Sequence, residues 1–309
     1  MRIAMMGSGG VGGFFGGRLA HAGCDVTFIA RGAHLAAMRE KGLTLASAAH
    51  GDIHLPRVEA TDDPAKVGPV DLVILSVKLW DTEATAHAIK PMVGPNTGVL
   101  SLQNGVVKDD ILRKVFPAEQ VMGGVGYVAT YISEPGTIHQ TGTMQRIVQG
   151  EYDGRLSERA TFLHEALTKA GVTAELSTDV RRAIWEKYVF LVGLSGTTTT
   201  MRRPLGDVRA NPRSRAFLHD LMREVVAVGR AHGVALAEDY ADQRLAFADT
   251  LPHDMTSSMH HDLERGNRLE VEWLAGGVVQ LGAQKGVPTP CNRAVWDVLA
   301  LHAQGRSAS

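Results

Sequence analysis

Short apolar runs alternate with amphipathic segments in the first half of the chain. Arg2–Met6, Asp25–Ala30 and Val70–Val77 predict strands, and the last is continuously apolar, as in a parallel strand buried on both faces. Val11–His21 and Thr82–Met92 predict helices between these strands. Repeated β-α-β units with short connections are typical of a doubly wound parallel sheet.

The same periodicities predict the remaining elements of this half. Helices are expected at His34–Lys41 and Lys108–Val115, and strands at Gly98–Leu102, Val121–Tyr131, Gly136–Gln140 and Arg146–Gly150. The last three strands are expected to be antiparallel. Leu43–Ala46 and Ile53–Leu55 predict a short antiparallel insertion.

After about Leu176 the pattern becomes helical throughout. Helices are expected at Asp179–Leu194, Arg213–His232, Tyr240–Ala248, Ser257–Arg265, Leu269–Lys285 and Asn292–His302. The predicted fold class is therefore α/β, an N-terminal Rossmann-type doubly wound parallel sheet followed by an all-α C-terminal domain. We expect the domains to cover residues 1–177 and 178–309.

Composition narrows the function classes. A chain of 309 residues that is 44% hydrophobic favours two domains, and its net charge of −1 does not predict nucleic-acid binding. The chain has only two cysteines, Cys24 and Cys291. This low number argues against a disulfide framework and favours a reducing cytoplasm. No apolar run is long enough for a membrane span, and the apolar stretch Ile3–Met6 leads directly into glycines, so it predicts a strand and not a signal peptide.

The first strand is followed by Gly7-Ser8-Gly9-Gly10-Val11-Gly12, which matches G-x-G-x-x-G and opens a predicted helix. This context is the one that the dinucleotide-binding fingerprint requires. The glycines permit a tight turn, close backbone approach to a pyrophosphate and helix–strand packing, and the helix N-terminus attracts phosphate. The alternative is a glycine-rich turn without a ligand.

The end of the second predicted strand bears on cofactor choice. NAD enzymes usually place an acidic residue there for the ribose 2′-hydroxyl, whereas this chain has Arg31. A guanidinium fits a 2′-phosphate, so NADP(H) is favoured over NAD(H). The alternative is that Arg31 is an ordinary surface charge.

Reduction of a carbonyl needs a proton donor close to the developing oxyanion. Lys187 lies in a predicted helix that is apolar nearly all round, where partial desolvation lowers a lysine pKa. Glu270 follows the predicted helix break at Gly266 and Asn267 and is expected in the first turn of the next helix. The alternatives are a lysine that reaches solvent and a carboxylate that only offsets a helix dipole.

Four further polar residues are candidates by position. Lys78 and Asn104 follow predicted strands at the carboxyl edge of the sheet, where open α/β folds bind ligands, although Asn-Gly is also a common turn. Ser257 and Ser258 stand where a helix begins, so either could be only an N-cap. The adjacent His260 and His261 lack the spacing of a metal pair, and no metal site is predicted.

These motifs together resemble the ketopantoate reductase family over essentially the whole chain. The resemblance rests on the Gly7–Gly12 fingerprint, Arg31, Lys78, Gln103-Asn104-Gly105, Trp185-x-Lys187, Ser257-Ser258-Met259, Glu270 and the segment Gly286–Asn292. It implies an NADPH-dependent enzyme that reduces 2-dehydropantoate, a small 2-oxo acid, to pantoate in pantothenate biosynthesis without a metal. A homodimer is left open.

The resemblance also implies residue roles. Lys187 would be the general acid, Glu270 would hold the hydroxyl end of the substrate beside the cofactor, and Ser258 would contact the substrate carboxylate. Asn104 and Lys78 would both orient the nicotinamide and the substrate. Arg31 would bind the 2′-phosphate.

The chain departs from the family pattern at several site positions. Leu191, Ser195 and Met255 stand where the family has asparagines, and Asp81 replaces an amide. We place Ser195 in the substrate-binding set. Since lost hydrogen-bonding groups change which polar analogues a site accepts, a related reductase of another 2-oxo acid is the main alternative. A non-catalytic NADP(H)-binding protein is a second alternative.

Overall fold

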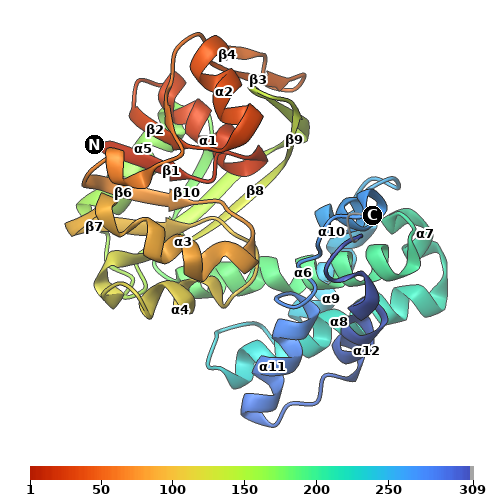
Figure 1. The fold of residues 1–309 in the computed structure, drawn as a ribbon. Helices are drawn as coiled ribbons and strands as arrows, with labels where there is room; N and C mark the ends of the chain where they lie inside the picture. The colour runs from red at the N-terminus through yellow and green to blue at the C-terminus, as the bar shows by residue number, and fades with distance from the viewer. Residues whose placement is uncertain (307–309) are drawn as a thin grey trace. The chain divides into compact units, whose positions relative to one another are not determined.

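The structure is a computed structural model that describes residues 1–306, and its contacts divide it into two units (Figure 1). The first unit holds Met1–Asn104 and Lys108–Ala183, and the second holds Gly105–Val107 and the chain from Ile184 onward. Apart from the short segment Gly105–Val107, the chain passes from the first unit to the second within helix α6 (Val180–Met201).

The first unit is built on a ten-stranded mixed sheet. Its parallel part has the order β8-β7-β6-β1-β2-β5. Those strands are Val121–Glu134, Val93–Ser101, Val70–Leu75, Arg2–Met6, Asp25–Ile29 and Glu59–Thr61 in that order. The doubly wound sheet predicted from the alternating pattern is thereby confirmed.

The sheet continues beyond β8 with a change of direction. β9 (Thr137–Gly150) runs antiparallel to β8 and pairs on its other side with the parallel strand β3 (Leu43–Ser47). β3 pairs in turn with the antiparallel strand β4 (Ile53–Leu55). β10 (Thr173–Leu176) also pairs with β9. The predicted antiparallel insertion is confirmed, and the last three predicted strands form one long hairpin.

Alternation along the central strand explains how helices cover both faces of the sheet. Ile3 and Met5 of β1 lie in a buried cluster with residues of α1 (Gly10–His21) and α5 (Glu158–Lys169). Ala4 and Met6 lie in a second cluster with residues of α3 (Thr82–Ala88) and α4 (Lys108–Arg113). Successive strand side chains point to opposite faces, so β1 is buried from both sides.

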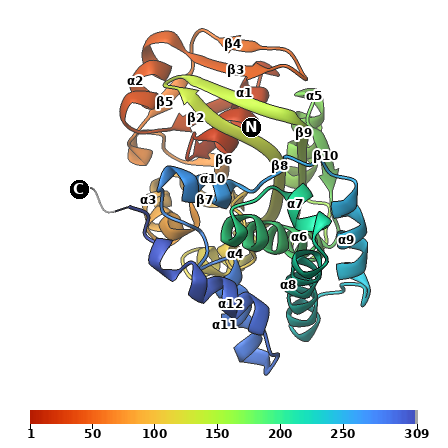
Figure 2. The ribbon, with the colours of Figure 1, turned by 90° about the vertical axis from the view of Figure 1, so that its right-hand side faces the viewer.

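The second unit contains no strand among its described residues, as the sequence predicts. Besides α6 it contains α7 (Leu205–Ala210), α8 (Pro212–Ala231), α9 (Tyr240–Asp249), α10 (Ser258–Arg265), α11 (Ala275–Lys285) and α12 (Pro290–Val298). α11 packs against α12, and both pack against α8 (Figure 2). Leu218, Leu221 and Val225 of α8 are fully buried in the core of this unit, at the spacing of one helix face.

The helix predicted over Leu269–Lys285 is wrong at its start, because α11 begins only at Ala275. Leu274 has φ −86° and ψ −93°, which is not helical, and the residues before it form turns. The Tyr188 hydroxyl donates to the carbonyls of Trp273 and Leu274, 3.0 and 2.7 Å away, so these carbonyls have a tertiary partner. Glu270 therefore precedes a turn and does not lie in the first turn of a helix.

The remaining elements are short. α2 covers Gly32–Lys41, and 3₁₀ turns lie at Pro64–Lys66, Leu79–Asp81, Lys90–Met92, Ala118–Gln120 and Ala300–His302. β5, β10, α5 and α7 have no counterpart among the predicted elements. Within residues 1–306, no helix combines the length and apolar character needed to cross a bilayer.

Candidate active site

The glycine turn after β1 is fixed by both neighbouring strands. The backbone N–H groups of Gly7 and Ser8 donate to the Ile29 carbonyl at the end of β2, over 3.2 and 3.0 Å. Gly7 has φ +91°, and a Cβ there would lie 2.7 Å from the Val77 side chain beyond β6. Because only glycine adopts this conformation readily and leaves this space, the turn requires Gly7.

The start of α1 leaves room for a ligand. Gly9 is its N-cap and supplies no side-chain cap, so the first-turn N–H groups keep their attraction for anions. A Cβ on Gly12 would lie 2.1 Å from the Gly7 carbonyl oxygen, whereas a Cβ on Gly9 would meet no atom within 4 Å. The helix thus packs tightly on the turn and faces open space at Gly9. This arrangement fits a dinucleotide pyrophosphate.

The other residues of the fingerprint hold the turn. Ser8 is 2% exposed, and its hydroxyl donates to the carbonyls of Met5 and Ile29, so its side chain is structural. A Cβ on Gly10 would lie 2.6 Å from the Thr130 carbonyl oxygen, and Val11 is half-buried. These two positions bring α1 close to the sheet.

Arg31 lies beside this turn. It follows β2, whose last carbonyl accepts the N–H groups of Gly7 and Ser8, and it is the N-cap of α2. Its side chain is exposed. A guanidinium at this strand end is suited to a phosphate on the adenosine ribose.

Lys78 and Asn104 follow the adjacent strands β6 and β7. The Lys78 ammonium lies 5.6 Å from the centre of the Trp80 ring. The Gln103 side-chain amide donates to the Lys78 carbonyl, 3.3 Å away, which joins the two strand ends. Asn104 is half-buried and precedes Gly105, whose φ is +83°. The first unit thus brings the glycine turn, Arg31, Lys78 and Asn104 to the same edge of its sheet, at the switch in strand order beside β1.

Lys187 and Glu270 belong to the second unit. Lys187 is half-buried on α6, and Glu270 is 6% exposed. The Glu270 carbonyl accepts the N–H groups of Trp273 and Leu274, over 3.1 and 3.0 Å, which forms the turn before α11. Tyr188, the neighbour of Lys187, donates its hydroxyl to the same turn. The structure therefore joins the two segments that carry the predicted proton donor and carboxylate.

The predicted serines have three different environments. Ser257 is the N-cap of α10, since its hydroxyl accepts the His260 N–H at 3.1 Å, and it also lies 3.1 Å from the Thr198 hydroxyl. Ser258 opens α10 and is exposed. Ser195 is 1% exposed, and its hydroxyl has no hydrogen-bond partner among residues 1–306. Burying a hydroxyl without a hydrogen-bond partner costs free energy. Of the three serines, Ser195 is therefore the one whose hydroxyl a bound ligand would satisfy.

Two of the four residues that depart from the family pattern are apolar and packed. Leu191 and Met255 pack against the core of the second unit. Asp81 ends the 3₁₀ turn after Lys78 and is exposed.

His260 is buried, with its Nδ1 2.8 Å from the Thr198 carbonyl oxygen. The described part of the chain holds no group of three or more His, Cys, Asp or Glu that could bind a metal.

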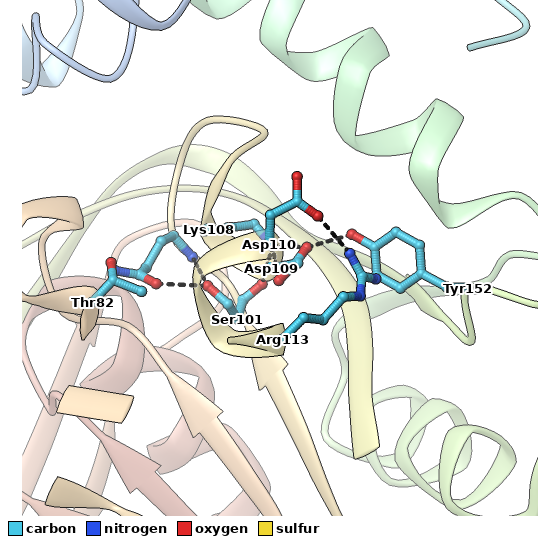
Figure 3. Close-up of polar contacts among 8 residues, drawn as sticks. Thr82, Ser101, Lys108, Asp109, Asp110, Arg113 and Tyr152 are labelled. Atoms are coloured by element: carbon cyan, nitrogen blue, oxygen red, sulfur yellow. Dashed lines mark hydrogen bonds and ion pairs between the residues drawn. The ribbon is translucent and has the colours of Figure 1, made fainter. Parts of the chain in front are cut away.

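A buried polar network at the end of β7 was missed by sequence reasoning. It centres on Lys108 and Asp109, which are 0% and 1% exposed (Figure 3). Two adjacent charges at a helix start are typical of a solvated surface, so their burial could not be predicted from their residue types. Only Gln103, inside the Gln-Asn-Gly motif, pointed to this region.

Comparison with known proteins identifies the family. The family model "Ketopantoate reductase PanE/ApbA" matches residues 3–154, and the model for its C-terminal part matches residues 179–303. A Bacillus subtilis protein named uncharacterized oxidoreductase YkpB is 29% identical and covers 98% of this chain and 99% of its own. A 2-dehydropantoate 2-reductase of Mesorhizobium japonicum is 32% identical and covers 96% of this chain and 95% of its own.

A solved structure supports the same assignment. The PanE/ApbA family ketopantoate reductase from Ralstonia eutropha JMP134 superposes with a TM-score of 0.89 at 35% identity, covering 98% of each chain. Both halves of the chain therefore match one family in sequence and in fold. The chain belongs to the ketopantoate reductase family of oxidoreductases.

Proposed function

We propose that this protein reduces 2-dehydropantoate to pantoate with NADPH. The observation that carries the proposal is the junction in the second unit between the helix of Lys187 and the turn of Glu270. There the Tyr188 hydroxyl joins the helix that carries the Lys187 ammonium to the turn that follows the Glu270 carboxylate, which supports the proposal. Relatives named 2-dehydropantoate 2-reductase, 32% identical over 96% of this chain, support the substrate.

In this proposal, residues 1–177 bind the cofactor. The N–H groups at the start of α1 and the space at Gly9 receive the pyrophosphate. Arg31 forms a charge-assisted hydrogen bond with the 2′-phosphate, which selects NADPH over NADH. Lys78 and Asn104, at the ends of adjacent strands, orient the nicotinamide and the substrate carbonyl.

In this proposal, residues 178–309 supply the groups that bind the substrate and the group that donates the proton. When bound, NADPH would supply a hydride for the carbonyl carbon of the oxo acid. Lys187 Nζ donates a proton to the carbonyl oxygen, so the C–O π bond is replaced by a new C–H bond and a new O–H bond while the C–O single bond remains, and the lysine regains its proton from solvent. Glu270 accepts a hydrogen bond from the substrate hydroxyl and also contacts the cofactor, while Ser258 and Ser195 bind the substrate.

A steady-state assay tests this proposal. Folded protein with NADPH bound should reduce 2-dehydropantoate with kcat/KM about tenfold or more above that for pyruvate or 2-oxobutyrate, since its branched hydroxyl end is recognised. NADPH oxidation and pantoate formation should be equimolar. If cofactor-loaded protein turns over none of these acids, the proposed reduction is rejected.

The second candidate is an NADPH-dependent reductase of a different small 2-oxo acid. Leu191 and Met255 favour it, because both side chains pack against the helical core and offer no amide to a substrate. The same assay separates the two candidates. A less polar oxo acid that exceeds 2-dehydropantoate in kcat/KM would support this reading and displace the first.

A further inference from the structure

A buried ion pair lies where β7 ends and α4 begins. The Lys108 ammonium donates to both carboxylate oxygens of Asp109, over 2.9 and 2.8 Å, and to the Ser101 carbonyl over 2.9 Å. Its three protons are thereby all directed at acceptors. Burial lowers the pKa of Lys108, and the Asp109 carboxylate opposes that shift. The pair is thus a fully bonded unit inside the first domain.

The pair is anchored to the segment that follows β9 (Figure 3). The Tyr152 hydroxyl donates to Asp109 over 2.6 Å. The Arg113 guanidinium lies 3.8 Å from the centre of the Tyr152 ring and donates to Asp110 over 2.9 Å. Burial and the Asp109 carboxylate raise the pKa of Tyr152, which keeps its proton on the hydroxyl as the donor.

On its other side the network reaches the two strand ends of the candidate active site. The Ser101 hydroxyl donates to the Gln103 side-chain oxygen over 2.9 Å. The Gln103 amide donates to the Thr82 hydroxyl over 2.8 Å and to the Lys78 carbonyl over 3.3 Å. The network of hydrogen bonds therefore extends from Tyr152 to the Lys78 carbonyl, and Gln103, which makes that last bond, is the residue before Asn104.

The Lys108 side chain also closes a loop. Its bond to the Ser101 carbonyl joins the last residue of β7 to the first residue of α4. The loop between them, residues 102–107, carries Asn104 and the left-handed Gly105. Such a closure restricts the conformations of the loop, so it fixes the direction in which Asn104 leaves the sheet.

The buried charges need an explanation other than stability. Removing two charges from water is costly, and replacing a buried pair by apolar residues of similar volume is often neutral or stabilising. A hydrophobic pair would fill the same space, yet it could not bond the Ser101 carbonyl. The hydrogen bonds, and the positions they impose, are what the charged pair adds.

We propose that Lys108, Asp109 and Tyr152 are positioning residues that hold Asn104 and Lys78 in place for the nicotinamide end of the cofactor. The inference rests on the proposed NADPH-dependent reduction. These residues touch neither cofactor nor substrate in this account, and they act through the 102–107 loop. Misplacing reacting groups by about 1 Å can lower the rate by a factor of about 100. The hydride-transfer rate is therefore expected to depend strongly on the position of this loop.

Two variants test the proposal. Y152F removes one hydroxyl and leaves the ring under Arg113. The double variant K108M/D109L removes both charges together, so it leaves no buried charge unpaired as K108M alone would. E151Q is the matched control, because it breaks a buried ion pair with Arg159, 2.7 Å long, in the same unit without touching the loop.

The first readout needs no substrate. Hydrogen–deuterium exchange of the amides of residues 102–107 should rise about tenfold in both network variants and stay at the wild-type rate in E151Q, because local protection reports local ordering. The second readout is single-turnover hydride transfer. Its rate should fall about 10- to 100-fold while the Kd of NADPH, held mainly at its phosphates, changes by less than about threefold.

The outcomes separate the two proposals. If both network variants lose thermal stability but match wild type in loop exchange and in transfer rate, the positioning role is overturned. If wild-type protein itself transfers no hydride to any 2-oxo acid, the proposed function fails. In that case, loop exchange with and without NADPH still decides whether the network orders residues 102–107.

Discussion

The Tyr188 hydroxyl donates a 2.7 Å hydrogen bond to the Leu274 carbonyl. Tyr188 follows Lys187 on α6, and Leu274 ends the turn that begins at Glu270. The two residues are 86 positions apart in sequence. One buried hydroxyl thus sets the spacing between the segments that carry the proposed proton donor and the proposed substrate-binding carboxylate.

Removing that hydroxyl should disturb both stability and rate. Tyr188→Phe removes the hydroxyl that donates to the carbonyls of Trp273 and Leu274, although Leu274 keeps the Val278 N–H, so we expect a loss of about 1–3 kcal/mol in unfolding free energy. We also expect kcat to fall, because the Glu270 turn is less restrained. Urea unfolding and steady-state kinetics measure the two effects. Tyr131→Phe, on a side chain that is 40% exposed, is the control, and a Tyr188 variant equal to it in both respects would contradict the account.

Lys187 should be the residue on which the reduction depends most. Lys187→Ala is expected to lower kcat by about two to four orders of magnitude, the range for a lost general acid. NADPH affinity should change little, since the pyrophosphate and 2′-phosphate are bound elsewhere. Lys285→Ala removes an exposed lysine at the end of α11 and serves as the control. An unchanged kcat in Lys187→Ala would remove this residue from the acid role.

Arg31 should decide between the two nicotinamide cofactors. Arg31→Ala is expected to weaken NADPH about 10- to 100-fold and NADH hardly at all, since a hydrogen bond to a charged group contributes about 1.5–3 kcal/mol. Fluorescence titration with each cofactor measures the difference. Arg57→Ala, also on an exposed arginine, should affect neither. Equal weakening of both cofactors would show that Arg31 does not read the 2′-phosphate.

Substitution of two glycines of the fingerprint should have different effects, one on NADPH affinity and the other on stability. A Cβ on Gly9 meets no protein atom within 4 Å, so Gly9→Ala should fold normally yet weaken NADPH by obstructing the pyrophosphate. A Cβ on Gly12 lies 2.1 Å from the Gly7 carbonyl oxygen, so Gly12→Ala should lose about 1–3 kcal/mol of stability or more through overpacking. Thermal unfolding and cofactor titration on both variants give the comparison. Normal NADPH affinity in Gly9→Ala would contradict a pyrophosphate at this position.

Local patterns predicted the first domain well. The strand from Arg2, the glycine turn and the helix after it follow from residue types that are adjacent in sequence, and the structure confirms all three. α5 was missed although Ser157 caps it and Leu163 and Leu167 recur at helical spacing. That signal was present in the sequence and could have been used.

Tertiary contacts explain what the sequence could not supply. The start of α11 was misplaced by six residues because Leu274 is not helical, and it ends a turn whose Trp273 and Leu274 carbonyls accept a hydroxyl from α6. Lys108 and Asp109 are adjacent charges, and their burial depends on Ser101 and Tyr152, which reach them from other segments. The hydrophobic periodicity of one helix cannot predict a partner that lies on another segment of the chain. The predicted site residues stand as proposals that the variants above test.

The most direct measurement follows a labelled hydrogen. NADPH carrying deuterium at C4 of the nicotinamide, incubated with wild-type protein and 2-dehydropantoate, should yield pantoate with one deuterium at C2 for each NADPH oxidised from the labelled face. Mass spectrometry of the product gives this ratio. Folded protein that binds the labelled cofactor but leaves the oxo acid unreduced, or forms pantoate without deuterium when either face of C4 is labelled, would contradict the account.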